Sequence, residues 1–293
     1  MGDYILHASA AGAKLRAFFA SSTETVGEAA RIHGTSPLVS AALGRLLTAG
    51  AIMGYMQKNE DDLVTLIIRG DGLIGGLVVS AGKDAGVKGY AYNSTAEVPL
   101  NAAGKLHVGR GLGFGTLSVI KDIGLKTPVT GQTELVTGEI AEDLTHYFAH
   151  SEQVPTAVAL GVLIERDLSV KQAGGFIVQL MPGAPEDLAE RIEQRLAVLP
   201  PVTMLMEQGN SPEDIMRLVL EGLEPSEIER HPVRYHCNCS RGRVLRALAG
   251  VGREELAAML EEDGGANLHC HFCAKDYAFG RAYIEELLRT HSP

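Results

Sequence analysis

The pattern of apolar and polar positions predicts a helical region early in the chain. Residues 4–19 are predicted to form a strand and then a short helix. TVGEAARIHG is typical of an amphipathic helix that ends at its glycine. Ser36 and Pro37 then suit the N-cap and first position of a helix that continues over 38–55. Because apolar residues cover most of its circumference, we expect this helix to lie buried at the centre of the main domain.

A strand-rich region follows the expected central helix. Its β-branched runs are short, and Gly, Asp-Gly or Pro separates them. GEIAEDLTHYFAHSEQ interrupts the runs as a helix with Ile140, Leu144, Tyr147 and Phe148 on one face. The expected strands are LVTLIIR, GLVVSAG, VKGYAY, KLHVG, GTLSVIKD, QTELV, AVALGVLIER and KQAGGFIVQLM. Together these elements predict an α+β fold class, with a large sheet-rich domain over residues 1–180.

Two smaller parts are predicted after this domain. Residues 181–230 hold eleven acidic side chains and four arginines, so they carry −7 of the chain's net charge of −10. Helices are expected at Glu186–Val198, after Pro201 and at Glu213–Leu220. Short acidic helices fold only while docked, so this stretch suits either a permanently packed layer or a helical linker of marginal stability. Residues 231–293 are expected to form a small helical domain that depends on a metal, because its apolar faces are modest.

The composition narrows the classes of function. A net charge of −10 argues against nucleic acid as the main partner, because phosphate binding needs a basic surface. The N-terminal residues lack the basic and apolar segments of a secretory signal, and free thiols suit a reducing cytoplasm. Leu38–Met56 is long and apolar, but Arg45 lies inside it. We therefore expect a buried helix rather than a membrane span, and a cytoplasmic protein.

Four cysteines, the only ones in the chain, are the strongest chemical signal. Cys237 and Cys239 lie in HCNCS, and Cys270 and Cys273 lie in HCHFC after thirty intervening residues. Two such pairs suit the tetrahedral ligand shell of Zn²⁺, so we expect the four thiolates to hold one zinc ion. The C-x-C spacing also permits a small disulfide ring. The pattern alone does not decide between a zinc scaffold and an oxidation sensor.

The residues around the cysteines predict reactive thiols. Ser240 suits the N-cap of a helix over Arg241–Ala249, and Cys273 precedes an expected helix over 275–288. Thiolates at helix N-termini and near basic side chains have lowered pKa values. The nearby basic residues are Arg241, Arg243 and Arg246. Three histidines flank the cysteines as competing ligands, proton buffers or solvated side chains, namely His236, His269 and His271.

Two other motifs raise the question of enzymatic activity. GRGLGFGTL lacks the spacing of a nucleotide-binding loop, and its period of two predicts four glycines on one face of a strand. These glycines are Gly109, Gly111, Gly113 and Gly115. One predicted helix also gathers His146, His150, Ser151 and Glu152, but no nucleophile-elbow motif accompanies them. We therefore expect the chain not to be an enzyme.

The cysteine arrangement resembles that of a redox-regulated bacterial chaperone family, the thirty-three-kilodalton heat-shock proteins. Further blocks resemble that family in the same order, over nearly the whole chain: SPLVSAALGRLLTAGAIMG, GDGLIGGL, VKGYAYN, GFGTLSVIKDIG, GEIAEDLTHYFAHSEQVPTAVALGV and QAGGFIVQLMPGA. The resemblance implies an inactive reduced form that binds zinc. It also implies an oxidised form, expected to be a homodimer, that holds unfolding client proteins without ATP under oxidative stress. It favours a linker that unfolds on oxidation over a packed layer for residues 181–230.

The four cysteines allow three disulfide connectivities. The resemblance implies the local pairs Cys237–Cys239 and Cys270–Cys273, and an argument from loop closure agrees. Either crossed connectivity would keep the long-range tie that zinc provides, whereas local pairs release it. Two alternative functions stay open: a zinc scaffold that binds a fixed partner, and a thiol–disulfide oxidoreductase that uses CHFC. Residues 231–293 hold eight basic and eight acidic side chains, which argues against a nucleic-acid partner.

Overall fold

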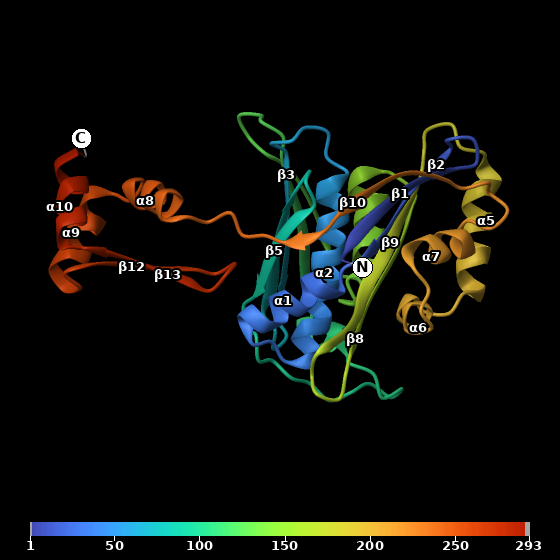
Figure 1. The fold of residues 1–293 in the computed structure, drawn as a ribbon, viewed down its shortest axis with the longest axis horizontal. Helices are drawn as coiled ribbons and strands as arrows, with labels where there is room; N and C mark the ends of the chain where they lie inside the picture. The colour runs from blue at the N-terminus through green and yellow to red at the C-terminus, as the bar shows by residue number, and fades with distance from the viewer. Residues whose placement is uncertain (1, 291–293) are drawn as a thin grey trace. The chain divides into compact units, whose positions relative to one another are not determined.

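The computed structural model describes residues 2–290, and the chain forms two compact units with their boundary between His236 and Cys237. The larger unit contains two sheets (Figure 1). The five-stranded sheet has the order β10 (Ser226–Pro232), β1 (Tyr4–Ala10), β2 (Leu15–Ser21), β9 (Val170–Leu180), β8 (Thr156–Ile164). The six-stranded sheet has the order β11 (Arg234–Tyr235), β5 (Gly86–Ala91), β4 (Gly76–Gly82), β3 (Leu63–Gly70), β6 (Gly115–Asp122), β7 (Val129–Glu134).

The expected central helix is confirmed as α2 (Pro37–Tyr55), which packs against strands of both sheets (Figure 1). The Ser36 hydroxyl accepts a hydrogen bond from the Val39 N–H, as its N-cap role requires. Among the described residues, α2 alone is long and apolar enough to cross a membrane, but 94% of its apolar window is buried inside the protein. The preceding helix, α1 (Thr23–His33), is also confirmed and ends at Gly34. The helix α2 is therefore the centre of the larger core, as its sequence predicts.

Two predictions need correction. The strand expected at the start of residues 4–19 is present as β1, but the expected helix is the strand β2, which is buried on both faces and therefore shows no alternating pattern. KLHVG is not a strand, since the short helix α3 (Val108–Leu112) begins within it. Two glycines therefore lie in α3, where a Cβ on Gly109 would stand 2.2 Å from the Thr137 carbonyl oxygen. The spacing of two between these glycines therefore does not mark one face of a strand. It reflects the close approach of other backbone segments to α3 and to the turn that follows it.

The helix predicted over residues 138–153 is present in two segments. The α-helix α4 (Ala141–Tyr147) continues as a π-helical turn, η1 (Phe148–Glu152). Its four predicted apolar positions are all buried, as expected. Of the residues that raised a hydrolase, Glu152 accepts hydrogen bonds from Lys121 and from the Tyr147 hydroxyl. This places Glu152 in a structural polar cluster.

Three helices cover the outer face of the five-stranded sheet, and we call them the helical layer (Figure 1). They are α5 (Glu186–Val198), α6 (Val202–Glu207) and α7 (Pro212–Val219), close to the predicted bounds. Their buried side chains include Leu188, Ile192 and Val219, which share one apolar cluster with Phe19 and Phe176 of the sheet. The chain then returns to this sheet as the edge strand β10, which the sequence pattern did not predict.

The smaller unit combines three helices with one hairpin. The elements are α8 (Arg241–Ala249), α9 (Arg253–Glu262), β12 (Gly265–Cys270), β13 (Lys275–Gly280) and α10 (Arg281–Thr290). The predicted helix over 275–288 is therefore wrong in its first part, because residues 275–280 pair with β12. Its core contains only five buried side chains among the described residues, namely Leu248, Leu256, Ala266, Phe279 and Ile284. A core of this size gives a unit little stability without a further cross-link.

Candidate metal centre

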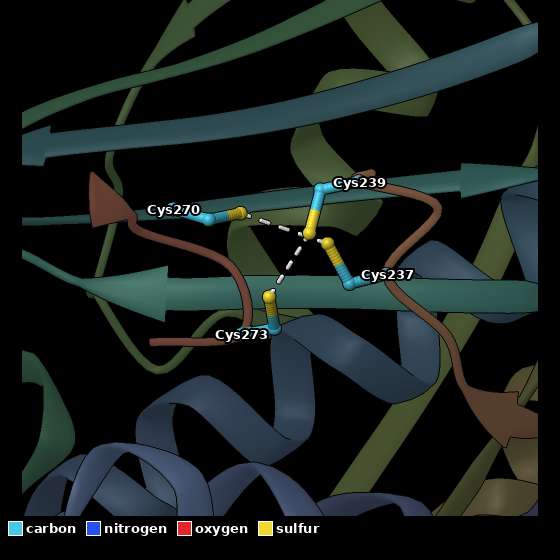
Figure 2. Close-up of side chains that lie close together, drawn as sticks. All are labelled: Cys237, Cys239, Cys270 and Cys273. Atoms are coloured by element: carbon cyan, nitrogen blue, oxygen red, sulfur yellow. Dashed lines mark hydrogen bonds between the residues drawn. The ribbon is translucent and has the colours of Figure 1, made fainter. Parts of the chain in front are cut away.

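The four cysteines converge at one place in the smaller unit (Figure 2). Cys237 and Cys239 lie in the segment before α8, Cys270 ends β12, and Cys273 lies in the turn before β13. Their sulfur atoms all lie within 4.8 Å of one another, and each side chain is partly buried. The structure thus brings together every sulfur that the sequence singled out.

One of the distances between the sulfurs matches a four-thiolate zinc shell, and another is shorter. The Cys237 and Cys270 sulfurs are 3.7 Å apart, and the Cys239 and Cys273 sulfurs are 3.2 Å apart. A Zn–S bond of about 2.3 Å in a tetrahedron places ligand sulfurs about 3.8 Å apart. Among the described residues, no other group of side chains offers three such ligands in one place. The four cysteines therefore fit a metal ion, and soft thiolate ligands in this geometry favour Zn²⁺.

The backbone around the two pairs differs from the prediction at one point. Ser240 caps α8 as expected, because its hydroxyl accepts from the Arg243 N–H. The second pair does not precede a helix. Instead, the N–H groups of Cys273 and Ala274 both donate to the Cys270 carbonyl, and Ala274 has a φ of 53°. A tight hairpin turn therefore presents Cys270 and Cys273 to the same metal position.

The hydroxyl group of Tyr277 lies 3.0 Å from the Cys239 sulfur. Burial raises the pKa of Cys239, but hydrogen bonds from Tyr277 and the neighbouring thiols outweigh this effect and hold the pKa at about 7. Burial raises the pKa values of Cys237 and Cys273. Cys239 is thus the thiol most easily deprotonated of these three. The sequence did not indicate Tyr277, because it predicted a helix at this position and the contact with Cys239 depends on the pairing of β12 with β13.

Arg241, one of the basic residues near the cysteines, has contacts other than those expected. The Arg241 guanidinium lies 4.4 Å from the centre of the Phe279 ring and 5.5 Å from that of Tyr283. It also donates to the Ala278 carbonyl oxygen. Arg241 therefore joins α8 to the hairpin and to α10, instead of acting on a thiol.

The flanking histidines are not part of the sulfur cluster. His269 pairs with Asp276 across the hairpin, with 2.7 Å between Nδ1 and Oδ1. His271 lies beside His269, with ring centres 5.6 Å apart. The His236 N–H donates to the Val87 carbonyl in the larger unit. Among the described residues, no histidine belongs to the group of side chains that could hold a metal ion.

Comparison with known proteins identifies the family. A family model described as Hsp33 protein matches residues 3–280 of the chain. The chain belongs to the Hsp33 family. Its relatives include a 33 kDa chaperonin of Ruminiclostridium cellulolyticum, 48% identical over 99% of both chains, and one of Acetivibrio thermocellus, 49% identical over 99% of this chain and 97% of the other.

A solved structure supports the same assignment. The crystal structure of a 33 kDa chaperonin, a heat shock protein 33 homolog, from Thermotoga maritima has a TM-score of 0.90 and 35% sequence identity. The similarity covers 99% of this chain and 98% of that one. The Hsp33 family consists of chaperones and not enzymes. This confirms the prediction that the chain is not an enzyme. A mixed fold with a large sheet-rich domain is likewise confirmed.

Replacing Tyr277 with phenylalanine should weaken zinc binding about tenfold. Groups that hydrogen-bond to a metal ligand typically change metal affinity about 10- to 100-fold when removed, and this change removes the hydroxyl beside Cys239. Competition with a chromogenic chelator measures the affinity. Tyr283→Phe is the matched control, because Tyr283 packs edge-to-face against Phe279 in the same unit and is not part of the sulfur cluster. Equal affinities in the two variants would contradict a role for the Tyr277 hydroxyl.

Proposed function

We propose that the chain is a redox-regulated holdase chaperone that works without ATP. In its reduced form, Cys237, Cys239, Cys270 and Cys273 hold one Zn²⁺ and the chaperone is inactive. On oxidation the smaller unit unfolds, the helical layer leaves the sheet, and the uncovered apolar face binds unfolding proteins. Membership of a chaperone family supports unfolding proteins as the clients. In this proposal residues 1–180 form the main domain that binds clients and dimerises, residues 181–230 form the linker, and residues 231–293 form the zinc-binding redox switch.

The covered apolar face carries this proposal. The outer face of the five-stranded sheet contributes Leu6, Ala8, Leu15, Phe19 and Phe176 to a cluster that the helical layer completes. A soluble chain rarely leaves an apolar surface of this kind exposed, so a layer that can leave it supplies a switchable binding surface. The helices of the layer are short, and short helices are stable only while they pack against a partner. Undocking therefore both unfolds the layer and exposes the sheet.

The smaller unit supplies the redox switch in this proposal. When bound, zinc contributes folding free energy on the order of 10–16 kcal/mol, which a core of five buried side chains cannot replace. Each disulfide forms when a pair of thiolates gives two electrons to one hydrogen peroxide molecule, which takes up two protons from solvent and leaves as two waters. Two disulfides thus consume two peroxide molecules and remove all four thiolate ligands. The chain runs from the helical layer through β10 and β11 into Cys237, so the switch and the layer are adjacent in sequence.

An aggregation assay tests the function directly. The reduced, zinc-loaded chain should fail to suppress aggregation of a heat-unfolded test protein, and the peroxide-treated chain should suppress it without nucleotide. Hydrogen exchange on the same samples should show loss of protection over both 186–219 and 237–290 after oxidation. Equal activity in the two forms would favour a zinc scaffold with a fixed partner. Loss of protection confined to 237–290 would leave the helical layer as a passive spacer.

The disulfides of the oxidised form should be the local pairs, Cys237–Cys239 and Cys270–Cys273. The sulfur distances of 3.7 Å and 3.2 Å join opposite segments, but all four sulfurs lie within 4.8 Å of one another, so proximity does not select the pairing. A crossed pair would close a loop of thirty residues and keep about 3–4 kcal/mol of cross-link stabilisation, whereas local rings keep almost none. Non-reducing peptide mapping of active protein checks this. A dominant peptide joining the two cysteine segments would contradict it.

The remaining parts of the proposal concern the cell and the partners. We place the protein in the cytoplasm, where reducing conditions keep four thiols free until stress. We propose a homodimer in the oxidised form, and neither a nucleic acid nor a membrane as partner. The acidic net charge of −10 supports the absence of a nucleic-acid role.

A further inference from the structure

The strand β8 forms the edge of the five-stranded sheet opposite β10, and β9 is its only strand partner in the described part of the chain. It is nine residues long, reads TAVALGVLI and carries no charged side chain. Natural proteins usually protect such an edge with charges, proline or a bulge, because a free edge pairs with other chains. The only irregularity in β8 is at its very end, between Leu163 and Ile164. An unprotected apolar edge of this length therefore calls for a functional explanation.

The register identifies which backbone groups are unpaired. The Leu180 N–H donates to the Pro155 carbonyl, so Pro155 and Leu180 form a hydrogen-bonded pair. In an antiparallel ladder such as that of β8 and β9, hydrogen-bonded pairs recur at every second residue. The odd-numbered residues of β8 thus bond to β9. The even-numbered residues direct their N–H and C=O groups away from it, and these residues are Thr156, Val158, Leu160 and Val162. Among the described residues, no other backbone group bonds to these four amides.

A groove of about 690 Å³ runs beside this edge. It is lined by β8 from Val158 onward, by Pro37 and Ala41 of α2, and by Pro201 and Val202 before and within α6. The walls beside the strand are mainly apolar, while charged groups of both signs, including Arg45 and Glu142, line the same groove. The groove therefore offers apolar side-chain space next to a row of free backbone donors and acceptors.

The helix α6 closes one side of this groove. A Cβ added to Gly161 would lie 2.4 Å from the Thr203 methyl group and 3.0 Å from a Val202 methyl group, so α6 packs directly on β8. Because α6 belongs to the helical layer, undocking of that layer would widen the groove along the strand. This links the edge to the proposed redox switch, and the following inference rests on that proposed function.

We propose that the outer edge of β8 binds an extended segment of an unfolding client protein as an added strand. Backbone pairing requires an extended chain but no particular sequence, which suits a chaperone with many clients, and the apolar walls accept alternate side chains. The occupant is a client segment, because α6 packs on β8 beside the groove until the helical layer leaves, and departure of that layer is the proposed step that activates client binding. The full groove becomes accessible when α6 leaves.

Amide hydrogen exchange of the oxidised chain tests this proposal, with reduced and carboxymethylated α-lactalbumin as the unfolded probe. The probe should protect the amides of Val158, Leu160 and Val162, and leave the already paired odd-numbered amides unchanged. Probe binding without this alternating protection would overturn the edge proposal and leave the holdase function standing. Protection that appears without probe and grows with protein concentration would mean that a second copy fills the edge. Failure of the oxidised chain to bind the probe would overturn both proposals.

A pair of variants at Val158 gives an independent test. Val158→Pro removes an N–H that makes no bond within the sheet and places a ring where the added strand would lie. Val158→Ala shortens the same side chain and keeps the N–H. Oxidised Val158→Pro should bind the probe about tenfold more weakly than oxidised Val158→Ala, because only the proline lacks the N–H that the added strand would use. Equal binding by the two variants, with the circular dichroism of both unchanged, would overturn the proposal.

Discussion

Replacing both Cys270 and Cys273 with serine should abolish zinc binding and unfold the smaller unit. These residues supply two of the four sulfurs that lie within 4.8 Å of one another, and serine is a poor ligand for Zn²⁺. The unit then loses a stabilisation on the order of 10 kcal/mol, while its core holds five buried side chains. We expect less than about a tenth of the original zinc content, and the loss of slow-exchanging amides over residues 237–290.

Metal analysis and hydrogen exchange on the reduced protein check this result. His269→Asn is the matched control, because His269 flanks Cys270 but pairs with Asp276 instead of joining the sulfur cluster. The control should retain one zinc ion per chain. Undiminished zinc in the double serine variant would refute the four-cysteine site. Complete loss of zinc with the smaller unit still folded would refute the metal-dependent switch.

Replacing Val219 with aspartate should make the reduced, zinc-loaded chain active. Val219 is 0% exposed and lies at the end of α7, in the apolar cluster between the helical layer and the sheet. Burying a carboxylate in this apolar cluster costs several kcal/mol, which opposes docking of the helical layer. We therefore expect the layer to leave the sheet without oxidation, and aggregation suppression to approach that of the oxidised chain.

The aggregation assay under reducing conditions measures this effect, together with the zinc content of the same sample. Val198→Asp is the matched control, because it makes the same substitution in α5 at a position that is 72% exposed. The control should stay inactive until it is oxidised. If Val219→Asp retains its zinc, has lost protection over 186–219 and is still inactive, then the covered sheet face is not the client surface.

The caps and the spacing of the cysteines could be predicted from the sequence because they depend on neighbours along the chain. Ser36 and Ser240 each accept the hydrogen bond expected of an N-cap, from an N–H three residues further on. The helix α2 was predicted to be buried because its own apolar residues cover most of its circumference. It packs against strands of both sheets. The metal position followed in the same way, since each C-x-C or C-x-x-C pair directs its sulfurs to one side of a local turn.

Segments that depend on a distant partner were assigned less well. Residues 275–280 follow a cysteine pair and contain residues common in helices, yet they form a strand because β12 offers six paired positions. The strand β2 was obscured for the same reason, since both of its faces are buried and no alternation remains to mark it as a strand. The edge strand β10, with the sequence SEIERHP, has mostly exposed side chains, so its pairing with β1 depends on the backbone.

The order of residues was enough to infer the family, the four-sulfur site and the positions of the helices α5, α6 and α7. The folded chain was needed to show which apolar face those helices cover, that Tyr277 contacts Cys239, and that the outer edge of β8 stays unpaired. The difference lies in the range of the interactions. Caps, helical periodicity and metal-ligand spacing act over a few residues, whereas strand pairing and the burial of a sheet face join residues far apart in the chain, for which a single sequence carries no local signal.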